Sequence, residues 1–147
     1  MLPSTSKVIE STVIKAPIES TWAVIRDLDL SFWSVVESST LQGTSPLEIG
    51  SSRKIKFKDG TVQTVRIVEI SELNRSISYE LVESVPPVPF MSSVNVITVK
   101  KVTSDNTCFI EWETYFSSDG GVEATEDSRF KKREALADLA ALLENSN

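Results

Sequence analysis

The sequence of 147 residues contains no histidine. Histidine is the commonest general base and the commonest metal ligand in proteins, so its absence excludes catalytic triads and zinc sites that depend on imidazole. Cys108 is the single cysteine, which also excludes an intramolecular disulfide and a cysteine-based zinc site. Because Cys108 lies in the strand-like run TCFIEW, we expect a buried, unreactive thiol. We expect neither a metal site nor a cofactor.

Long apolar runs and a surplus of positive charge are also absent. No apolar run approaches the roughly 20 residues of a membrane span, and the N-terminus lacks the basic and apolar regions of a signal peptide. Asp and Glu number 21 against 15 Lys and Arg, a formal net charge of −6, which argues against sequence-independent binding of nucleic acid. The segment GTSPLEIG lacks the lysine of a phosphate-binding loop. We expect one domain, 1–147, that is cytoplasmic and a monomer or weak homodimer.

Short segments of alternating apolar and polar residues make up most of the chain. They are rich in β-branched residues and are separated by turn residues, among which Asp59-Gly60 is the strongest hairpin pattern. Seven strands are predicted, at 7–15, 36–42, 51–57, 61–71, 76–83, 91–102 and 107–117. The segment 84–89 has three prolines and is predicted as a loop that could gate a site.

Helical periodicity follows the first strand. Pro17 suits the first turn of a helix, and Ile18, Trp22 and Ile25 share one helical face, which predicts a short helix at 17–27. The apolar segment 29–35 is interpreted as a second small helix or a turn.

The last segment, 121–147, is the only one long and periodic enough for a major helix, with Thr125 as a plausible capping residue. Its C-terminal half carries an apolar stripe, and the same stripe becomes polar and basic towards the N-terminus. The stripe consists of Leu136, Leu139, Ala140 and Leu143, and it continues back through Arg133 or Lys132 to Arg129. Such a helix would seal a core at one end and face a cavity or solvent at the other.

The order of elements is strand, two short helices, six strands, long helix. Strands joined by tight turns predict an antiparallel meander, and a single amphipathic helix must bury its stripe against that sheet. The fold class is therefore α+β.

In this order the chain resembles the SRPBCC superfamily, which includes the START and birch-pollen-allergen helix-grip proteins, and is most similar to its polyketide cyclase/dehydrase-like branch. The resemblance rests on KVIESTVIKAPIESTWAVIRDLDLSFW, GSSRKIKFKDG, RIVEISELNRSISYELVES, VITVKKV, FIEWETYF and ALADLAALLE, in that order. It implies a curved seven-stranded sheet that grips the C-terminal helix, with a hydrophobic cavity between them. Members of the superfamily bind or transform lipids, polyketides, hormones and other apolar molecules.

Onion lachrymatory-factor synthase is a distant member whose catalysis uses a pocket arginine and a glutamate. The resemblance carries the arginine over to Arg53, the candidate catalytic residue, whereas Val65 stands at the position of the glutamate. Bacterial relatives often carry Trp-His-Pro after the first helix; here Trp33 is followed by Ser34 and Val35. The departures leave the family's acid and histidine without a counterpart.

Strand alternation places Arg53 on the same side as Ile55 and Phe57 and turns Lys54 and Lys56 outwards. A cation on an apolar wall suits an anionic or carbonyl head group, although Arg53 near the strand's start could instead extend to solvent. The other candidate ligand-binding residues are apolar or aromatic wall positions and polar groups near them: Trp33, Val65, Tyr79, Leu81, Phe90, Asn95, Trp112, Arg129 and Arg133.

Three functions remain open from the sequence. The first is binding or carriage of a hydrophobic small molecule (a lipid, polyketide or isoprenoid-like compound) under the C-terminal helix. The alternative is a cofactor-independent cyclase, dehydratase or isomerase acting in the same cavity, with Arg53 stabilising an oxyanion. The third is a protein–protein module that acts through the acidic surface and the proline loop.

Overall fold

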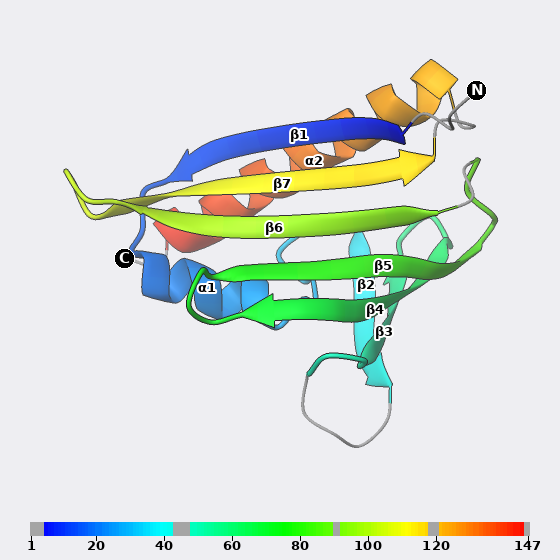
Figure 1. The fold of residues 1–147 in the computed structure, drawn as a ribbon, viewed down its shortest axis with the longest axis horizontal. Coiled ribbons are helices and arrows are strands. Elements are labelled where there is room, and N and C mark those ends of the chain that lie inside the picture. Colours follow the sequence, from blue (N-terminus) through cyan, green and yellow to red (C-terminus); the bar gives the residue numbers. More distant parts are fainter. Residues whose placement is uncertain (1–4, 43–47, 90–91, 118–120, 146–147) are drawn as a thin grey trace.

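The computed structural model describes residues 5–42, 48–89, 92–117 and 121–145, which form an open antiparallel sheet and two helices (Figure 1). The elements are β1 (Thr5–Ile14), α1 (Ile18–Arg26), β2 (Val36–Gln42), β3 (Ser52–Phe57), β4 (Val62–Ser71), β5 (Ser76–Val85), β6 (Ser93–Val102), β7 (Thr107–Ser117) and α2 (Gly121–Glu144). The seven strands are ordered β1-β7-β6-β5-β4-β3-β2, so that β2 to β7 form a meander and β1 joins its far side. The α+β helix-grip fold predicted from the sequence is confirmed.

The long helix α2 runs along β1 and β7 in Figure 1, and α1 lies near its C-terminal end. Both helices pack on the same face of the sheet, which we call the inner face. The register shifts within β2–β3 and within β4–β5, and such irregularities bend strands. Because the sheet curves, the arm formed by β2, β3 and β4 turns towards the helices.

Residues of β7 show why one face of the sheet is buried. Along this strand every second side chain is buried, from Cys108 through Ile110 and Trp112 to Phe116, in the two-residue period of an extended chain. Ile14, Ile55, Ile67, Ile77 and Ile97 from other strands are also buried and join the same core. The thiol of Cys108 donates a hydrogen bond to Thr21 Oγ1 at 3.2 Å, and burial raises the pKa of this thiol. A buried cysteine is confirmed.

The hairpin between β3 and β4 has the turn chemistry that the sequence indicates. Gly60 has a φ of 94°, a conformation that L side chains rarely adopt. The Asp59 carboxylate accepts a hydrogen bond from the backbone N–H of Thr61 at 2.9 Å, and this bond lowers the pKa of Asp59. The turn thereby sets the register of β3 on β4.

Of the two alternatives for residues 29–35, a second small helix or a turn, the structure shows the turn and no second short helix. They form successive turns, with Leu28 and Leu30 buried at φ values of 50° and 56°. The backbone N–H of Trp33 donates to the Leu30 carbonyl at 3.0 Å, which closes one of these turns. The two leucines are held by packing in a left-handed conformation that interrupts any helix.

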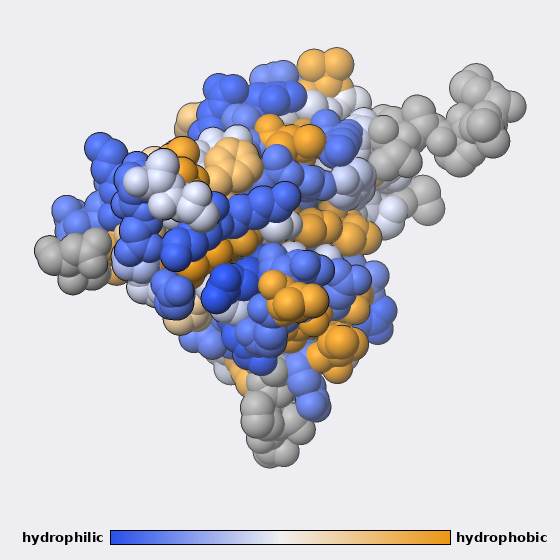
Figure 2. All heavy atoms as spheres, turned by 60° about the vertical axis from the view of Figure 1, so that its left-hand side comes forward, coloured by the Kyte–Doolittle hydropathy of each residue, from blue (hydrophilic) through white to orange (hydrophobic). Residues whose placement is uncertain are grey.

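Several element boundaries differ from the expectation by one or two residues, and two differences change the interpretation. The helix α2 begins at Gly121, so Thr125 lies inside it and donates its hydroxyl hydrogen bond to the Gly121 carbonyl at 3.4 Å instead of capping it. Strand β5 continues to Val85, two residues into the segment predicted as a loop. Within the described ranges, no helix is long and apolar enough to cross a membrane. Hydrophilic side chains predominate on the face shown in Figure 2, and apolar ones form small separate groups.

Candidate functional site

Two groups of buried apolar side chains lie between the inner face and α2. The larger group includes Leu136, Leu139 and Leu143 from the C-terminal half of the helix. The smaller group is formed by Val8, Phe116 and Ala124 at the opposite end of the helix. The helix therefore packs on apolar side chains at both ends, and the residues between them decide what the site can do.

Polar residues occupy the interval between the two groups, and we call Asn95, Thr114, Ser128 and Lys132 the polar band. On the sheet, Thr114 lies between Trp112 and Phe116 and donates to Asn95 Oδ1 at 2.6 Å. On α2, Ser128 and Lys132 lie one turn apart, between Ala124 and Ala135. Polar pairs in both layers keep this part of the interior from being a plain hydrophobic core.

Lys132 is the charged member of the polar band, with 6% of its surface exposed. Its Nζ donates to Ser128 Oγ at 2.8 Å and lies 5.3 Å from the centroid of the Trp112 ring. The pKa of Lys132 is lowered to about 7, mainly by burial and to a smaller extent by the charge of Lys131. The carboxylates of Glu10 and Asp127 act in the opposite direction and raise it. At neutral pH the amine is therefore poised between its charged and neutral forms.

Tyr79 lies beside Asn95 in the register of β5 and β6 and is buried. Burial raises the pKa of its phenol well above the ordinary value, and the neighbouring Trp112 indole opposes this rise. The hydroxyl of Tyr79 therefore stays protonated at neutral pH and can act as a hydrogen-bond donor.

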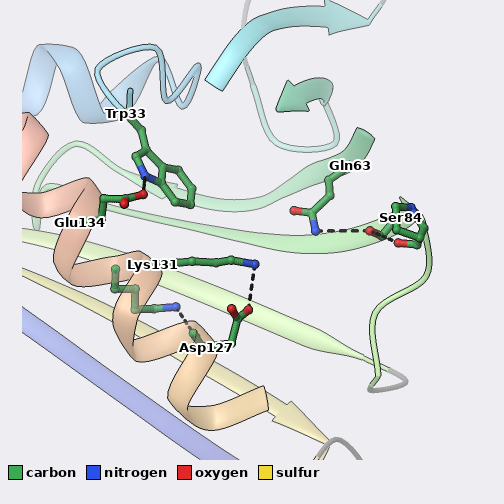
Figure 3. Close-up of polar contacts among 9 residues, drawn as sticks. Trp33, Gln63, Ser84, Asp127, Lys131 and Glu134 are labelled. Carbon is green, nitrogen blue, oxygen red and sulfur yellow. Dashed lines mark hydrogen bonds and ion pairs between the residues drawn. The ribbon is translucent and has the colours of Figure 1, made fainter. Parts of the chain in front are cut away.

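Trp33 connects the curved arm of the sheet to the helix. Its ring centroid lies 5.5 Å from that of Phe57 on β3 and 6.5 Å from that of Trp112 on β7, both in edge-to-face geometry. Its indole N–H donates to Glu134 Oε1 at 2.9 Å, as Figure 3 shows. The backbone N–H of the next residue, Ser34, donates to Asp138 Oδ2 at 2.8 Å. The turn segment is thus fastened twice to α2.

Arg53 lies on the inner side of β3, where its Nη1 donates to Ser39 Oγ at 3.3 Å. Its Nε is buried and has no hydrogen-bond partner, and Trp112 Nε1 is in the same condition. Among the described residues these are the two buried side-chain nitrogen or oxygen atoms without a partner. A buried donor without an acceptor is unfavourable by about 1–3 kcal/mol. The inner face carries two such donors, and an acceptor on a ligand would stabilise them.

Of the other residues predicted for the site, some lie on the inner face and others do not. Ile55 and Val65 are buried on the inner face, and Leu81 is partly buried there. Arg133 does not join this wall: its side chain is exposed and forms an ion pair with Glu10 on β1. Arg129 is partly exposed on α2. Phe90 lies outside the described residues.

A hollow of about 150 Å³ adjoins the sheet where β5 ends and β6 begins. The residues that line it include Leu81 and Ser93 of the two strands and Pro87 and Val88 of the proline-rich segment. Ser84 accepts a hydrogen bond from Gln63 Nε2 at 3.3 Å and itself donates to the Pro86 carbonyl at 2.8 Å (Figure 3). The proline-rich segment is therefore tied to the sheet beside this hollow. In the described parts of the chain no group of three or more possible metal ligands occurs.

Sequence reasoning did not select Lys132, Ser128 or Thr114. The helical stripe allowed either Lys132 or Arg133 to face the sheet, and only the structure distinguishes these neighbours. Thr114 follows directly from the alternation of β7, which places it on the same face as Trp112. That signal was present in the sequence.

Comparison with known proteins gives a family and several similar structures. The family described as "Polyketide cyclase / dehydrase and lipid transport" matches residues 5–144. A protein of Nitrosospira multiformis superposes with a TM-score of 0.84 at 29% sequence identity, covering 97% of this chain and 100% of that one. The protein XoxI of Bacillus cereus gives a TM-score of 0.81 at 23% identity, covering 94% and 95%.

A plant protein shares the fold at lower identity. Major latex-like protein 151 of Panax ginseng superposes with a TM-score of 0.75 at 18% identity, covering 95% of this chain and 97% of that one. No curated protein matches the chain significantly.

Proposed function

Because the chain belongs to the polyketide cyclase/dehydrase and lipid transport family, within the SRPBCC superfamily, we propose that it binds and carries a hydrophobic small molecule between the inner face of the sheet and α2. The ligand class we propose is that of lipids, polyketides and isoprenoid-like compounds. Apolar burial would supply most of the affinity, at about 25 cal/mol for each Å² removed from water.

The observation that carries this proposal is the pair of buried donors without a partner, Arg53 Nε and Trp112 Nε1. A packed apolar core gains nothing from such groups, since each one is unfavourable unless it finds an acceptor. A ligand with an apolar body and one or two oxygen atoms would satisfy them. The family description, which includes lipid transport, supports the same conclusion.

Extraction of the purified protein under denaturing conditions, followed by small-molecule mass spectrometry, tests the proposal. We expect an apolar compound in an amount comparable to that of the protein. The refolded, extracted protein should then bind decan-1-ol in a calorimetric titration. If no compound is extracted and decan-1-ol does not bind, the proposal is wrong.

Arg53→Met tests the contribution of the guanidinium, and Lys54→Met is its matched control. Arg53 lies on the inner side of β3, whereas the adjacent Lys54 is exposed. We expect Arg53→Met to weaken binding of the extracted compound about tenfold, as loss of a charge-assisted hydrogen bond would, and Lys54→Met to leave it unchanged. Equal affinities in the two variants would remove Arg53 from the site.

A second candidate function is a cyclase, dehydratase or isomerase, and the observation that favours it is the protonated, buried phenol of Tyr79 near the inner face. Arg53 would stabilise a developing oxyanion and Tyr79 would donate a hydrogen bond or a proton. In that case the extracted compound should be converted on incubation with fresh protein, and Arg53→Ala should abolish conversion while binding remains measurable. A compound that is recovered unchanged argues for carriage.

A further inference from the structure

Lys132 is buried without a carboxylate. In the described part of the chain, no acidic oxygen lies within ion-pair distance of its Nζ, although other lysines and arginines have such partners. The two acids whose charges raise the pKa of Lys132 are engaged elsewhere, since Glu10 pairs with Arg133 and Asp127 pairs with Lys131. Its one hydrogen bond is to the hydroxyl of Ser128. An ammonium has three N–H donors, so its capacity is only partly used.

The Trp112 ring brings a second donor to the same place. Nζ of Lys132 lies over the ring, and the unpartnered Nε1–H leaves from its edge, so two donors surround a single indole. The hydroxyl of Tyr79, protonated by burial, lies beside the same indole. Thr114 and Asn95 complete the polar band but are already bonded to each other. Among the described residues, the cluster therefore offers the ammonium of Lys132 no carboxylate to balance its charge.

A carboxylate fits this cluster better than the other common head groups. It supplies acceptors only and carries a single negative charge, which one lysine balances. A phosphate monoester carries about two charges at neutral pH, one of which would stay uncompensated among buried side chains. An alcohol supplies an acceptor but leaves the ammonium without a counter-charge.

We propose that Lys132 and Trp112 form a subsite for the carboxylate of an amphipathic acid whose apolar chain lies along the inner face. The inference rests on the proposed function and adds to it the chemical class of the ligand. In this arrangement Lys132 Nζ balances the charge, Trp112 Nε1 donates to a carboxylate oxygen, and Ser128 orients the amine.

Calorimetric titration of the extracted protein with decanoate and decan-1-ol tests the proposal, because the two probes share their chain and differ in the head group. At about pH 6.5 we expect decanoate to bind about tenfold more tightly than decan-1-ol, as expected for one charge-assisted contact. Lys132→Met should abolish this preference, and Lys131→Met, which changes the exposed neighbour, should preserve it. Trp112→Phe keeps the ring and removes the N–H, so it should reduce the preference even if Lys132→Met fails to fold.

The pH dependence of the preference is an independent measurement. Above about pH 7 the free amine loses its proton, so decanoate binding requires proton uptake and its affinity should fall towards about pH 9, while that of decan-1-ol stays constant. The groups that face the amine are Glu10 from β1, Asp127 and Lys131 from α2, and Tyr79 by way of Trp112. Burial raises the pKa of the Tyr79 phenol, so the phenol remains protonated throughout this range.

Three outcomes separate the inference from the function on which it rests. Tighter binding of decanoate that depends on Lys132 supports both. Equal binding of the two probes by the unaltered protein, or a preference that survives Lys132→Met, overturns the carboxylate subsite and leaves hydrophobic binding intact. Binding of neither probe overturns both.

Discussion

Burial of a lysine amine is unfavourable when no carboxylate pairs with it. Lys132 is buried, and among the described residues no carboxylate forms an ion pair with it. Its pKa of about 7 lies below the value of 10.5 in an unfolded chain, so the unfolded state binds more protons between these two values. The contribution of Lys132 to the free energy of unfolding should therefore rise as pH increases from about 7 to 10.5. It should be lowest below about pH 7.

Lys132→Met should consequently raise the free energy of unfolding at pH 6.5 by about 1–4 kcal/mol, since it replaces an unpaired buried ion with an apolar side chain of similar length. The gain should shrink as pH rises from about 7 towards the lysine's unfolded pKa, because removing the proton from the amine then costs progressively less. Urea denaturation at several pH values measures this. Lys131→Met, at an exposed position paired with Asp127, should change little. A loss of stability in Lys132→Met would show that the amine is well satisfied in the native protein.

Gly60 is a residue whose conformation alone decides the effect of substitution. A Cβ added there meets nothing within 4 Å, so any effect of Gly60→Ala comes from its φ of 94° and not from a clash. We expect a loss of about 1–2 kcal/mol in the free energy of unfolding, measured by urea denaturation. An unchanged free energy would mean that the turn relaxes to another conformation.

Among the elements, the turn segment 29–35 is fastened to α2 by the Trp33 indole and the Ser34 backbone. A double-mutant cycle of Trp33→Phe and Glu134→Ala isolates the indole–carboxylate bond. We expect a coupling energy of about 1 kcal/mol, typical of a hydrogen bond to a charged group that is partly buried. Additive effects of the two substitutions would indicate that the bond contributes nothing to stability.

The elements were predictable where their patterns were local. The bounds of β2 and β7 agree residue for residue with the sequence prediction, because alternation and flanking turns determine them. For residues 29–35 the sequence left a small helix or a turn open, and it could not decide for the turn because the positive φ of Leu28 and Leu30 is not visible in a local pattern. The choice between Lys132 and Arg133 as the inward residue likewise depends on the rotation of α2 against the sheet. A helical pattern defines that rotation only to within one residue.

At the scale of the whole molecule, both helices and the strands share one main core. Leu139 is fully buried within it, so Leu139→Ala should reduce the free energy of unfolding by about 2–5 kcal/mol and keep a single cooperative transition. Leu142→Ala, at a position that is 46% exposed, is the matched control and should change it much less. Unfolding in two separate steps, followed by circular dichroism and tryptophan fluorescence, would contradict a shared core.

The packing of α2 is unequal along its length. The C-terminal half contributes Leu136, Leu139 and Leu143 to the main core and is fastened by the turn segment, whereas the N-terminal half contributes Ala124 to a small group. Local opening free energies follow buried contacts, so backbone amides of the N-terminal half should exchange with solvent deuterium much faster than those after Ala135. The helix can thus fray from its N-terminal end while its C-terminal half stays docked. A ligand would then reach the polar band through partial opening of one helix, at a rate set by that exchange and not by global unfolding.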